Sequence, residues 1–331
     1  MQGVPLCNLR SRVRVSAIVA VTVVSLASLT FAQPPNSTWK KVVTANSPSA
    51  RSGCVMFYDP ASQKLVMFGG WDGSEYPTDT WTFDGTNWTQ VQTATAPPGR
   101  AGASAALDST LNQVIMYGGY DHEYLNDTWM WDGVNMTWVQ ATPAKTPHPV
   151  TGPMLFTDPL KGNVDEFGGW DGRRYQLTTW RWVDDNWRKQ FPKAFPSARA
   201  AAVIGTNPAM KQTVVFGGLA EVNPVNTWTF DGKQWTQQFP ANQPPQHLNV
   251  GTVYDPRFHG VVTFGGFIGE DANDMWLWDG SNWSQLFPKK SPPPREQMGM
   301  AFYDTQLETV VFGGLSGNSL LNDTWVLKVT K

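Results

Sequence analysis

Basic side chains recur at a constant distance before the Gly-Gly pairs of this chain and could bind an anion. Each lies 18 residues before the first glycine of a Gly-Gly pair. The set consists of Arg51, Arg100, Arg199, His247 and Arg295, with Val150 at the sixth position. Because a planar guanidinium matches a planar anion, such a set around one opening would suit carboxylates, acidic sugars or acidic peptide side chains. The alternative is that each arginine pairs with a neighbouring acid inside the fold, because structural ion pairs also repeat in this way.

Aromatic and charged residues follow the first three Gly-Gly pairs and indicate a binding rim. These segments begin Trp71-Asp72, Tyr120-Asp121 and Trp170-Asp171, and the third continues to Arg173 and Tyr175. The three later segments begin with Leu219, Phe267 and Leu315. Aromatic faces beside carboxylates and arginines suit a sugar ring or a peptide, through stacking and oriented hydrogen bonds. The alternative is that these aromatics only pack their loops onto the sheets.

Two carboxylates interrupt one apolar segment. Asp165 and Glu166 stand where other copies have apolar pairs, and Arg181 follows in the next predicted strand. Two carboxylates in a strand packed on both faces are costly unless they are paired. We expect Arg181 to pair with Glu166, which would make the change structural. The alternative is a catalytic pair of acid and base groups.

The elements that must position these residues belong to a repeat. Six Gly-Gly pairs begin at residues 69, 118, 168, 217, 265 and 313, at intervals of 49, 50, 49, 48 and 48 residues. A first tryptophan follows each pair, at Trp81, Trp129, Trp180, Trp228, Trp276 and Trp325. A second follows in five copies, at Trp88, Trp138, Trp187, Trp235 and Trp283. Apolar segments without alternation predict strands buried on both faces. Asp-Gly pairs such as Asp84-Gly85 predict two-residue hairpins.

A period near 50 residues with a Gly-Gly pair and two spaced tryptophans resembles the kelch repeat, over nearly all of the chain after residue 32. The resemblance implies an all-β fold, a six-bladed β-propeller with four antiparallel strands in each blade. The sixth repeat lacks its second tryptophan, whereas residues 36–39, ending in Trp39, resemble residues 86–88. We therefore expect residues 37–43 to form the outermost strand of the sixth blade, so that the N-terminal strand closes the ring.

The kelch resemblance implies a binding module, because kelch proteins commonly bind partners on the face formed by the loops after the Gly-Gly pairs. We expect a protein or an acidic glycan as the ligand, and no catalytic residues. The alternative is a sugar-converting enzyme similar to a kelch-like sialic acid epimerase at the same arginine-lined mouth. The four histidines are scattered and Cys54 has no cysteine partner after residue 32, which speaks against a galactose-oxidase-like copper site. We expect no metal and no cofactor.

Residues 1–32 are typical of a signal peptide. Three arginines, at positions 10, 12 and 14, precede an apolar stretch that ends in a small-residue cleavage pattern before Gln33. The alternative is a retained membrane anchor. Cleavage would remove three arginines and no acid, so that 22 basic and 27 acidic side chains would remain in a propeller domain at 33–331. We expect a secreted or periplasmic monomer without stable membrane insertion and, because no basic face is clustered, without a nucleic-acid partner.

Overall fold

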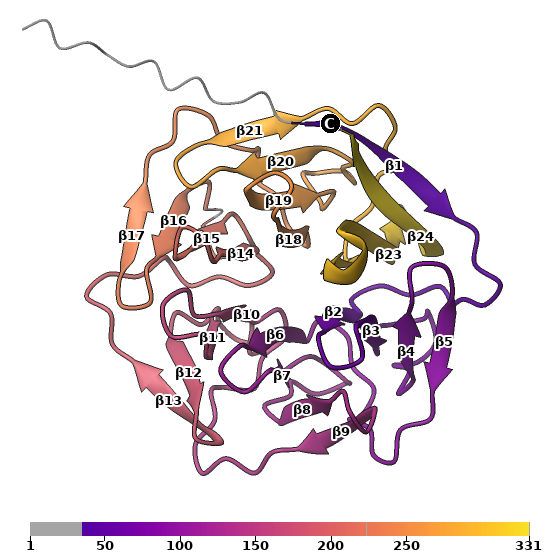
Figure 1. Ribbon diagram of the computed structural model, residues 1–331. Coiled ribbons are helices and arrows are strands. Elements are labelled where there is room, and N and C mark those ends of the chain that lie inside the picture. Colours follow the sequence, from indigo (N-terminus) through magenta and orange to yellow (C-terminus); the bar gives the residue numbers. More distant parts are fainter. Residues whose placement is uncertain (1–34, 223, 331) are drawn as a thin grey trace, which may run out of the picture. The chain divides into compact units, whose positions relative to one another are not determined.

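Six four-stranded antiparallel sheets stand around a central axis in the computed structural model (Figure 1). The structure describes residues 35–222 and 224–330, and the predicted signal peptide lies outside these residues. Each sheet is one blade. In the first five blades the chain runs from the innermost strand to the outermost and then enters the next blade. The prediction of an all-β, six-bladed propeller is confirmed. Among the described residues, no helix is long and apolar enough to cross a membrane.

The strands have similar lengths in all blades. The first blade contains β2 (Val55–Asp59), β3 (Lys64–Phe68), β4 (Thr80–Phe83) and β5 (Trp88–Val91), and the second contains β6 (Ser104–Asp108), β7 (Gln113–Tyr117), β8 (Thr128–Asp132) and β9 (Thr137–Gln140). The third contains β10 (Met154–Thr157), β11 (Val164–Phe167), β12 (Thr179–Val183) and β13 (Asn186–Gln190), and the fourth contains β14 (Val203–Asn207), β15 (Gln212–Phe216), β16 (Thr227–Phe230) and β17 (Trp235–Gln238). The fifth contains β18 (Gly251–Asp255), β19 (Gly260–Phe264), β20 (Met275–Trp278) and β21 (Trp283–Leu286).

The sixth blade combines segments from both ends of the described chain. It contains β22 (Gly299–Tyr303), the short 3₁₀ helix η1 (Asp304–Gln306), β23 (Glu308–Ser316), β24 (Ser319–Thr330) and, as its outermost strand, β1 (Asn36–Val42). β1 runs antiparallel to β24 from the pair Asn36↔Thr330 to the pair Val42↔Thr324. In Figure 1 the indigo β1 lies along the outer side of the yellow β24.

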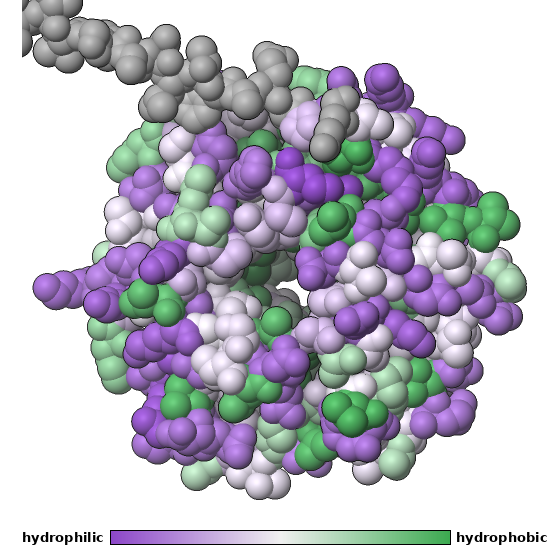
Figure 2. Space-filling view, in the orientation of Figure 1, coloured by the Kyte–Doolittle hydropathy of each residue, from purple (hydrophilic) through white to green (hydrophobic). Residues whose placement is uncertain are grey.

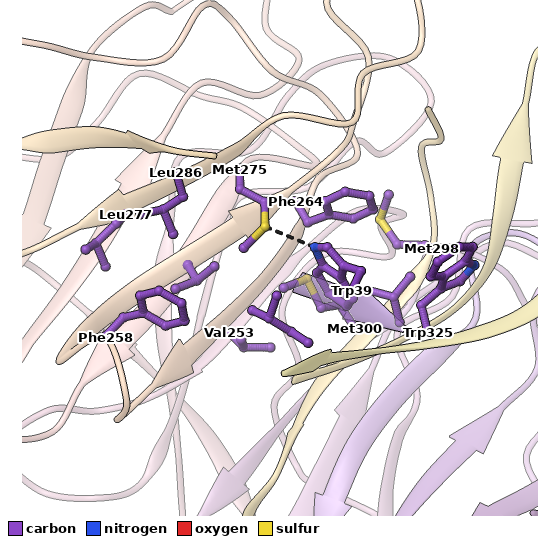
Figure 3. Packing of buried hydrophobic residues seen from close by; sticks show 13 residues of the cluster. Trp39, Val253, Phe258, Phe264, Met275, Leu277, Leu286, Met298, Met300 and Trp325 are labelled. Atoms are coloured by element: carbon purple, nitrogen blue, oxygen red, sulfur yellow. Dashed lines mark hydrogen bonds between the residues drawn. The ribbon is translucent and has the colours of Figure 1, made fainter. Parts of the chain in front are cut away.

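The hydrophobic core lies between the blades. One cluster joins Val66 and Phe68 of the first blade to Met116 and Trp138 of the second, and the other interfaces are built in the same way. The middle strands are therefore covered on both faces, which explains why β3 and β11 are buried along almost their whole length. Figure 3 shows the cluster between the fifth and sixth blades, where Trp39 packs beside Phe264 with ring centroids 5.1 Å apart.

The second tryptophan of each repeat joins two neighbouring blades. Trp138 in β9 donates its indole N–H to Thr80 Oγ1 in the preceding blade, at 3.1 Å. The same bond joins Trp88 to Thr324, Trp187 to Thr128, Trp235 to Thr179 and Trp283 to Thr227. Trp39 takes this place in the sixth blade and donates to Met275 Sδ at 3.1 Å (Figure 3). The outermost strand of every blade is thus attached to the blade before it.

The Asp-Gly turns between the third and fourth strands are longer than predicted. Phe83 lies opposite Trp88, so four residues, 84–87, form the loop instead of two. Asp84 Oδ1 accepts the backbone N–H groups of Thr86 and Asn87, both at 2.8 Å. Aspartate favours such local bonds, so the Asp-Gly pattern marked the turn but not its length.

Candidate functional site

The basic side chains of the predicted anion site are buried inside the blades. Their relative exposures are 3% or less, and this holds for Arg51, Arg100, Arg199, His247 and Arg295. Arg100 binds Asp127 through both ends of its guanidinium, at 2.5 Å to Oδ1 and 2.8 Å to Oδ2. The pairs Arg51–Asp79 and Arg295–Asp323 repeat this arrangement, and His247 Nε2 lies 3.0 Å from Asp274 Oδ1. The geometry therefore matches the structural alternative, internal pairing, instead of a set of charges open to the channel.

The same residues connect neighbouring blades through their backbone. The second glycine of each Gly-Gly pair donates its N–H to the carbonyl of the basic position, or of Val150, in the next blade. Gly70 donates to Arg100 at 2.8 Å, and the circuit closes where Gly314 donates to Arg51 at 2.9 Å. A Cβ on Gly69 would lie only 2.6 Å from the Arg100 carbonyl oxygen. The first glycine of each pair is thus required by the close approach of the next blade, whereas a Cβ on the second, as at Gly70, would meet the Ser52 carbonyl oxygen of its own blade.

Two blades depart from the Arg–Asp pair. In the third blade both partners change, to Val150 and Thr178. In the fourth, Arg199 keeps its place but faces Asn226, whose Oδ1 accepts from Arg199 Nη2 at 2.9 Å. The first tryptophan donates to the aspartate in four other blades. In the fourth, however, the indole N–H of Trp228 has no hydrogen-bond partner among the described residues. Burial without a carboxylate lowers the pKa of Arg199 to about 10.

Restoring the missing carboxylate is expected to stabilise the protein. In Asn226→Asp, one oxygen can pair with Arg199 and the other can accept from Trp228, as Oδ1 of Asp127 accepts from Arg100 and Oδ2 accepts from Trp129. We expect the free energy of unfolding near neutral pH to rise by about 1–3 kcal/mol, because a buried cation and a buried donor both gain a partner. Urea unfolding measures this, and Asn242→Asp is the control for added charge. Equal stability of the wild type and Asn226→Asp would contradict the expectation.

A closed ring of backbone hydrogen bonds surrounds the channel. Its members lie two residues after each position of the basic register, and they are Gly53, Gly102, Gly152, Ala201, Asn249 and Gln297. Each donates its N–H to the carbonyl of the member in the preceding blade at 2.8–3.2 Å, and Gly53 closes the ring by donating to Gln297. All six have φ between 50° and 67°. Sequence reasoning missed this ring, because only half of its members are glycine and the one common signal is the fixed offset.

The ring borders a cavity of about 700 Å³ along the channel. Figure 2 shows the face in view hollowed at its centre. Tyrosines, Trp170 and four methionines contribute to the wall, together with small residues and a few neutral polar groups such as Asn249 and Gln297. Cys54 also lines it, and burial raises the pKa of this thiol to about 11, so that it is protonated near neutral pH. None of the lining residues is charged, which makes the cavity suited to a neutral or apolar group.

The predicted aromatic rim forms a continuous stripe over the first three blades. Its ring-to-ring contacts run from Trp71 to Tyr76 (4.8 Å), from Tyr76 to Tyr120 (6.2 Å) and from Tyr120 to Tyr124 (5.1 Å). Tyr124 abuts Gly172 of the third blade, where Trp170 and Tyr175 lie 4.6 Å apart. We call these six residues the aromatic stripe. Tyr120, Tyr124, Trp170 and Tyr175 line the cavity, whereas Trp71 is not among its lining residues.

The aspartates of the predicted rim mainly hold their own loops. Asp72 Oδ1 accepts the N–H groups of Ser74 and Glu75, both at 2.9 Å. The hydrogen bonds from Glu75 and Ser74 lower the pKa of Asp72. Asp171 Oδ1 accepts the N–H groups of Arg173 and Arg174 at 2.8 Å. Asp121 is half-buried, and the Arg173 side chain is exposed.

A comparison with protein families agrees with the repeat pattern. The model of the KLHDC2/KLHL20/DRC7 Kelch-repeats domain matches residues 22–153. The chain is a kelch-repeat β-propeller. Kelch propellers are typical protein-interaction modules. No curated protein matches this chain.

The buried carboxylates of this kelch propeller are paired differently from the prediction. Arg181 lies opposite Asp165 and binds both of its oxygens at 2.7 Å, and it also contacts Asp158. Consecutive residues of a strand point to opposite faces, so Glu166 faces away from Arg181. The expected Arg181–Glu166 pair is therefore wrong. Within the part of the chain that the structure describes, Glu166 Oε2 has no hydrogen-bond partner. Burial, with the nearby Asp165 charge, raises the pKa of Glu166 well above its usual value.

Replacing Glu166 by glutamine is expected to remove a pH dependence of stability. The folded pKa is raised, so the contribution of Glu166 to stability is complete below its unfolded pKa of about 4.3 and is lost as the pH rises towards the folded pKa. Glu166→Gln should therefore be more stable than the wild type at mildly alkaline pH, and the difference should shrink on acidification. Urea unfolding across this range measures it, and a difference independent of pH would contradict the assignment. Asp184→Asn, at an exposed turn, is the control.

Proposed function

We propose that this kelch propeller is an exported interaction module that binds a protein through the aromatic stripe and the uncharged cavity beside it. The observation that carries the proposal is the stripe itself, six aromatic residues over three blades, four of which line the cavity. Tyrosine and tryptophan dominate the energetic centres of protein interfaces. The loops of the other three blades offer no comparable aromatic series.

A protein ligand is favoured over an acidic glycan by the distribution of charge. The four arginines and the histidine that would recognise carboxylates are buried, and most are already paired with aspartate. The loops that carry the stripe expose Arg173 and Arg174, and Arg174 Nε lies 3.8 Å from Asp171 Oδ2. An apolar or neutral peptide segment entering the cavity would bury aromatic surface without leaving a charge unpaired. A glycan remains an outcome of the test.

The test compares two aromatic positions of one register. Trp170 and Phe267 are both half-buried, and each forms one bridge to the strand entry of its blade and one within its own loop. The expected partners are proteins captured by the wild type and by Phe267→Ala but not by Trp170→Ala. Isothermal titration with each isolated partner should show that Trp170→Ala binds with an affinity lower by about tenfold or more. Equal affinities of the two variants would contradict the proposal. Loss confined to acidic glycans on an array would assign the glycan instead.

Export is tested separately, because it rests on residues 1–32 alone. We expect expression in a bacterial host to yield protein outside the cytoplasm that begins at Gln33, as determined by N-terminal sequencing. Protein that retains residue 1 and pellets with membranes would instead support a retained anchor.

A further inference from the structure

Four consecutive blades expose an apolar side chain at the same position. The position lies four residues after the second tryptophan of the repeat, and its occupants are Val43, Gln92, Thr142, Phe191, Phe239 and Phe287. The relative exposures are 84%, 85% and 80% for the three phenylalanines and 93% for Val43. Single exposed apolar residues need no explanation, but a series at one register on neighbouring blades does. The third to the sixth blades carry the series, whereas the first and second blades have polar residues.

These four side chains lie at one level of the propeller. Each follows the last pair of an outermost strand, Gln190↔Thr179, Gln238↔Thr227, Leu286↔Met275 or Val42↔Thr324, and so leaves its blade at the same sheet edge. Equivalent positions on a closed ring of similar blades share one height along the axis. The four residues therefore form an arc in one plane, on four neighbouring blades. Proline follows each of the three phenylalanines and restricts the backbone there.

The chain around the arc is basic, although the whole chain has a formal net charge of −2. The segments 36–46, 186–198, 235–246 and 283–294 contain no acidic residue. Their exposed cations are Lys40, Lys41, Arg188, Lys189, Lys193, Lys289 and Lys290. Among the described residues, only Arg188 of this set forms an ion pair, with the exposed Asp184. The corresponding segments of the first two blades, 88–99 and 138–149, contain a single lysine.

We propose that this arc docks the propeller onto an anionic lipid surface. The phenylalanines would enter the boundary between headgroups and acyl chains, and the lysines would contact anionic headgroups. A soluble polyanion would use the cations but leave the phenylalanines in water, whereas a flat lipid surface uses both. Docking of this kind is peripheral and needs no spanning segment. It goes beyond the proposed function, because the arc covers the third to sixth blades while the aromatic stripe covers the first three.

The experiment measures binding of the full chain to vesicles. Phosphatidylcholine vesicles with and without phosphatidylglycerol are sedimented with the wild type and with the triple variant Phe191→Ser/Phe239→Ser/Phe287→Ser. The matched control is Gln92→Ser/Thr142→Ser, at the same register in the first two blades. We expect binding to the anionic vesicles to fall by about tenfold or more in the triple variant and to stay at the wild-type level in the control. Because the phenylalanines are exposed, thermal unfolding should be the same in all three proteins.

A second variant separates lipid from other anions. Lys40→Gln/Lys41→Gln/Lys289→Gln/Lys290→Gln should abolish the preference for anionic vesicles, and added salt should weaken wild-type binding in the same direction. The proposal is overturned if the wild type does not bind anionic vesicles, or if the phenylalanine variant binds them as well as the control does. Heparin binding that depends on the lysines but not on the phenylalanines, without vesicle binding, would assign a polyanion instead.

Discussion

Deleting residues 33–45 is expected to destabilise the propeller by about 5 kcal/mol or more, which approaches the whole stability of a typical domain. The deletion removes all of β1, including the fully buried Trp39 and its contacts with Phe264 and Met275. It also exposes the edge of β24 along seven residue pairs. An exposed edge of this length is a template for pairing with other chains, so aggregation should accompany the loss.

The control for this deletion moves the strand instead of losing it. Because β1 is antiparallel to β24, residues 36–45 joined after the C-terminus through a short linker can occupy the same place beside β24. Thermal unfolding and size-exclusion chromatography should show near-native stability and a monomeric elution for this permuted chain. A deletion variant as stable as the wild type would contradict the role of β1, and so would a permuted chain as unstable as the deletion.

Arg100→Val is expected to lower the free energy of unfolding by about 3–5 kcal/mol, because it leaves Asp127 and the Gly118 carbonyl without their buried cation. The double variant Arg100→Val/Asp127→Thr should lose much less, about 1–2 kcal/mol, since no unpaired charge remains. The third blade already carries this combination, as Val150 and Thr178. Urea unfolding of the two single variants and the double variant gives the coupling energy directly, and additive effects would contradict a pair that acts as a unit.

The same variants should differ in their response to pH. Burial alone would raise the pKa of Asp127, but the hydrogen bonds and charge of Arg100 hold it below its usual value. In the wild type this contribution is present above the unfolded pKa of about 3.9 and is lost as the pH falls through the folded pKa. Without Arg100 the sign reverses, because the buried carboxyl then favours its neutral form. The difference in unfolding free energy between the wild type and Arg100→Val should therefore shrink on acidification. Urea unfolding near pH 7 and near pH 4 measures this difference.

The inferred lipid-binding arc and the aromatic stripe give the two parts of the ring different surfaces. If the arc rests on a membrane, the third to sixth blades face the lipid. A partner bound by the stripe would then be held beside the membrane. Vesicle binding of Trp170→Ala should equal that of the wild type, since Trp170 lies outside the arc.

The repeated features of this protein were accessible from its sequence. A Gly-Gly pair and two tryptophans at a nearly constant period predicted six equivalent blades, because each repeat must bury the same faces against its neighbours. The requirement for glycine follows from the repeat as well, because a Cβ added at Gly69 would lie only 2.6 Å from the Arg100 carbonyl oxygen of the next blade. The likeness of residues 36–39 to the start of an outermost strand also indicated where β1 would pair.

The partners of individual charges were decided only by the tertiary structure. Sequence spacing placed four arginines at one register but could not show that their charged ends turn into the blade towards Asp79, Asp127, Asn226 and Asp323. Arg181 likewise pairs with Asp165 and not with Glu166, because strand register sets which side chains share a face. The packing of neighbouring blades brings residues about 50 positions apart into contact. The hydrogen-bonded ring and the uncharged cavity that it borders therefore have no local signal in the sequence.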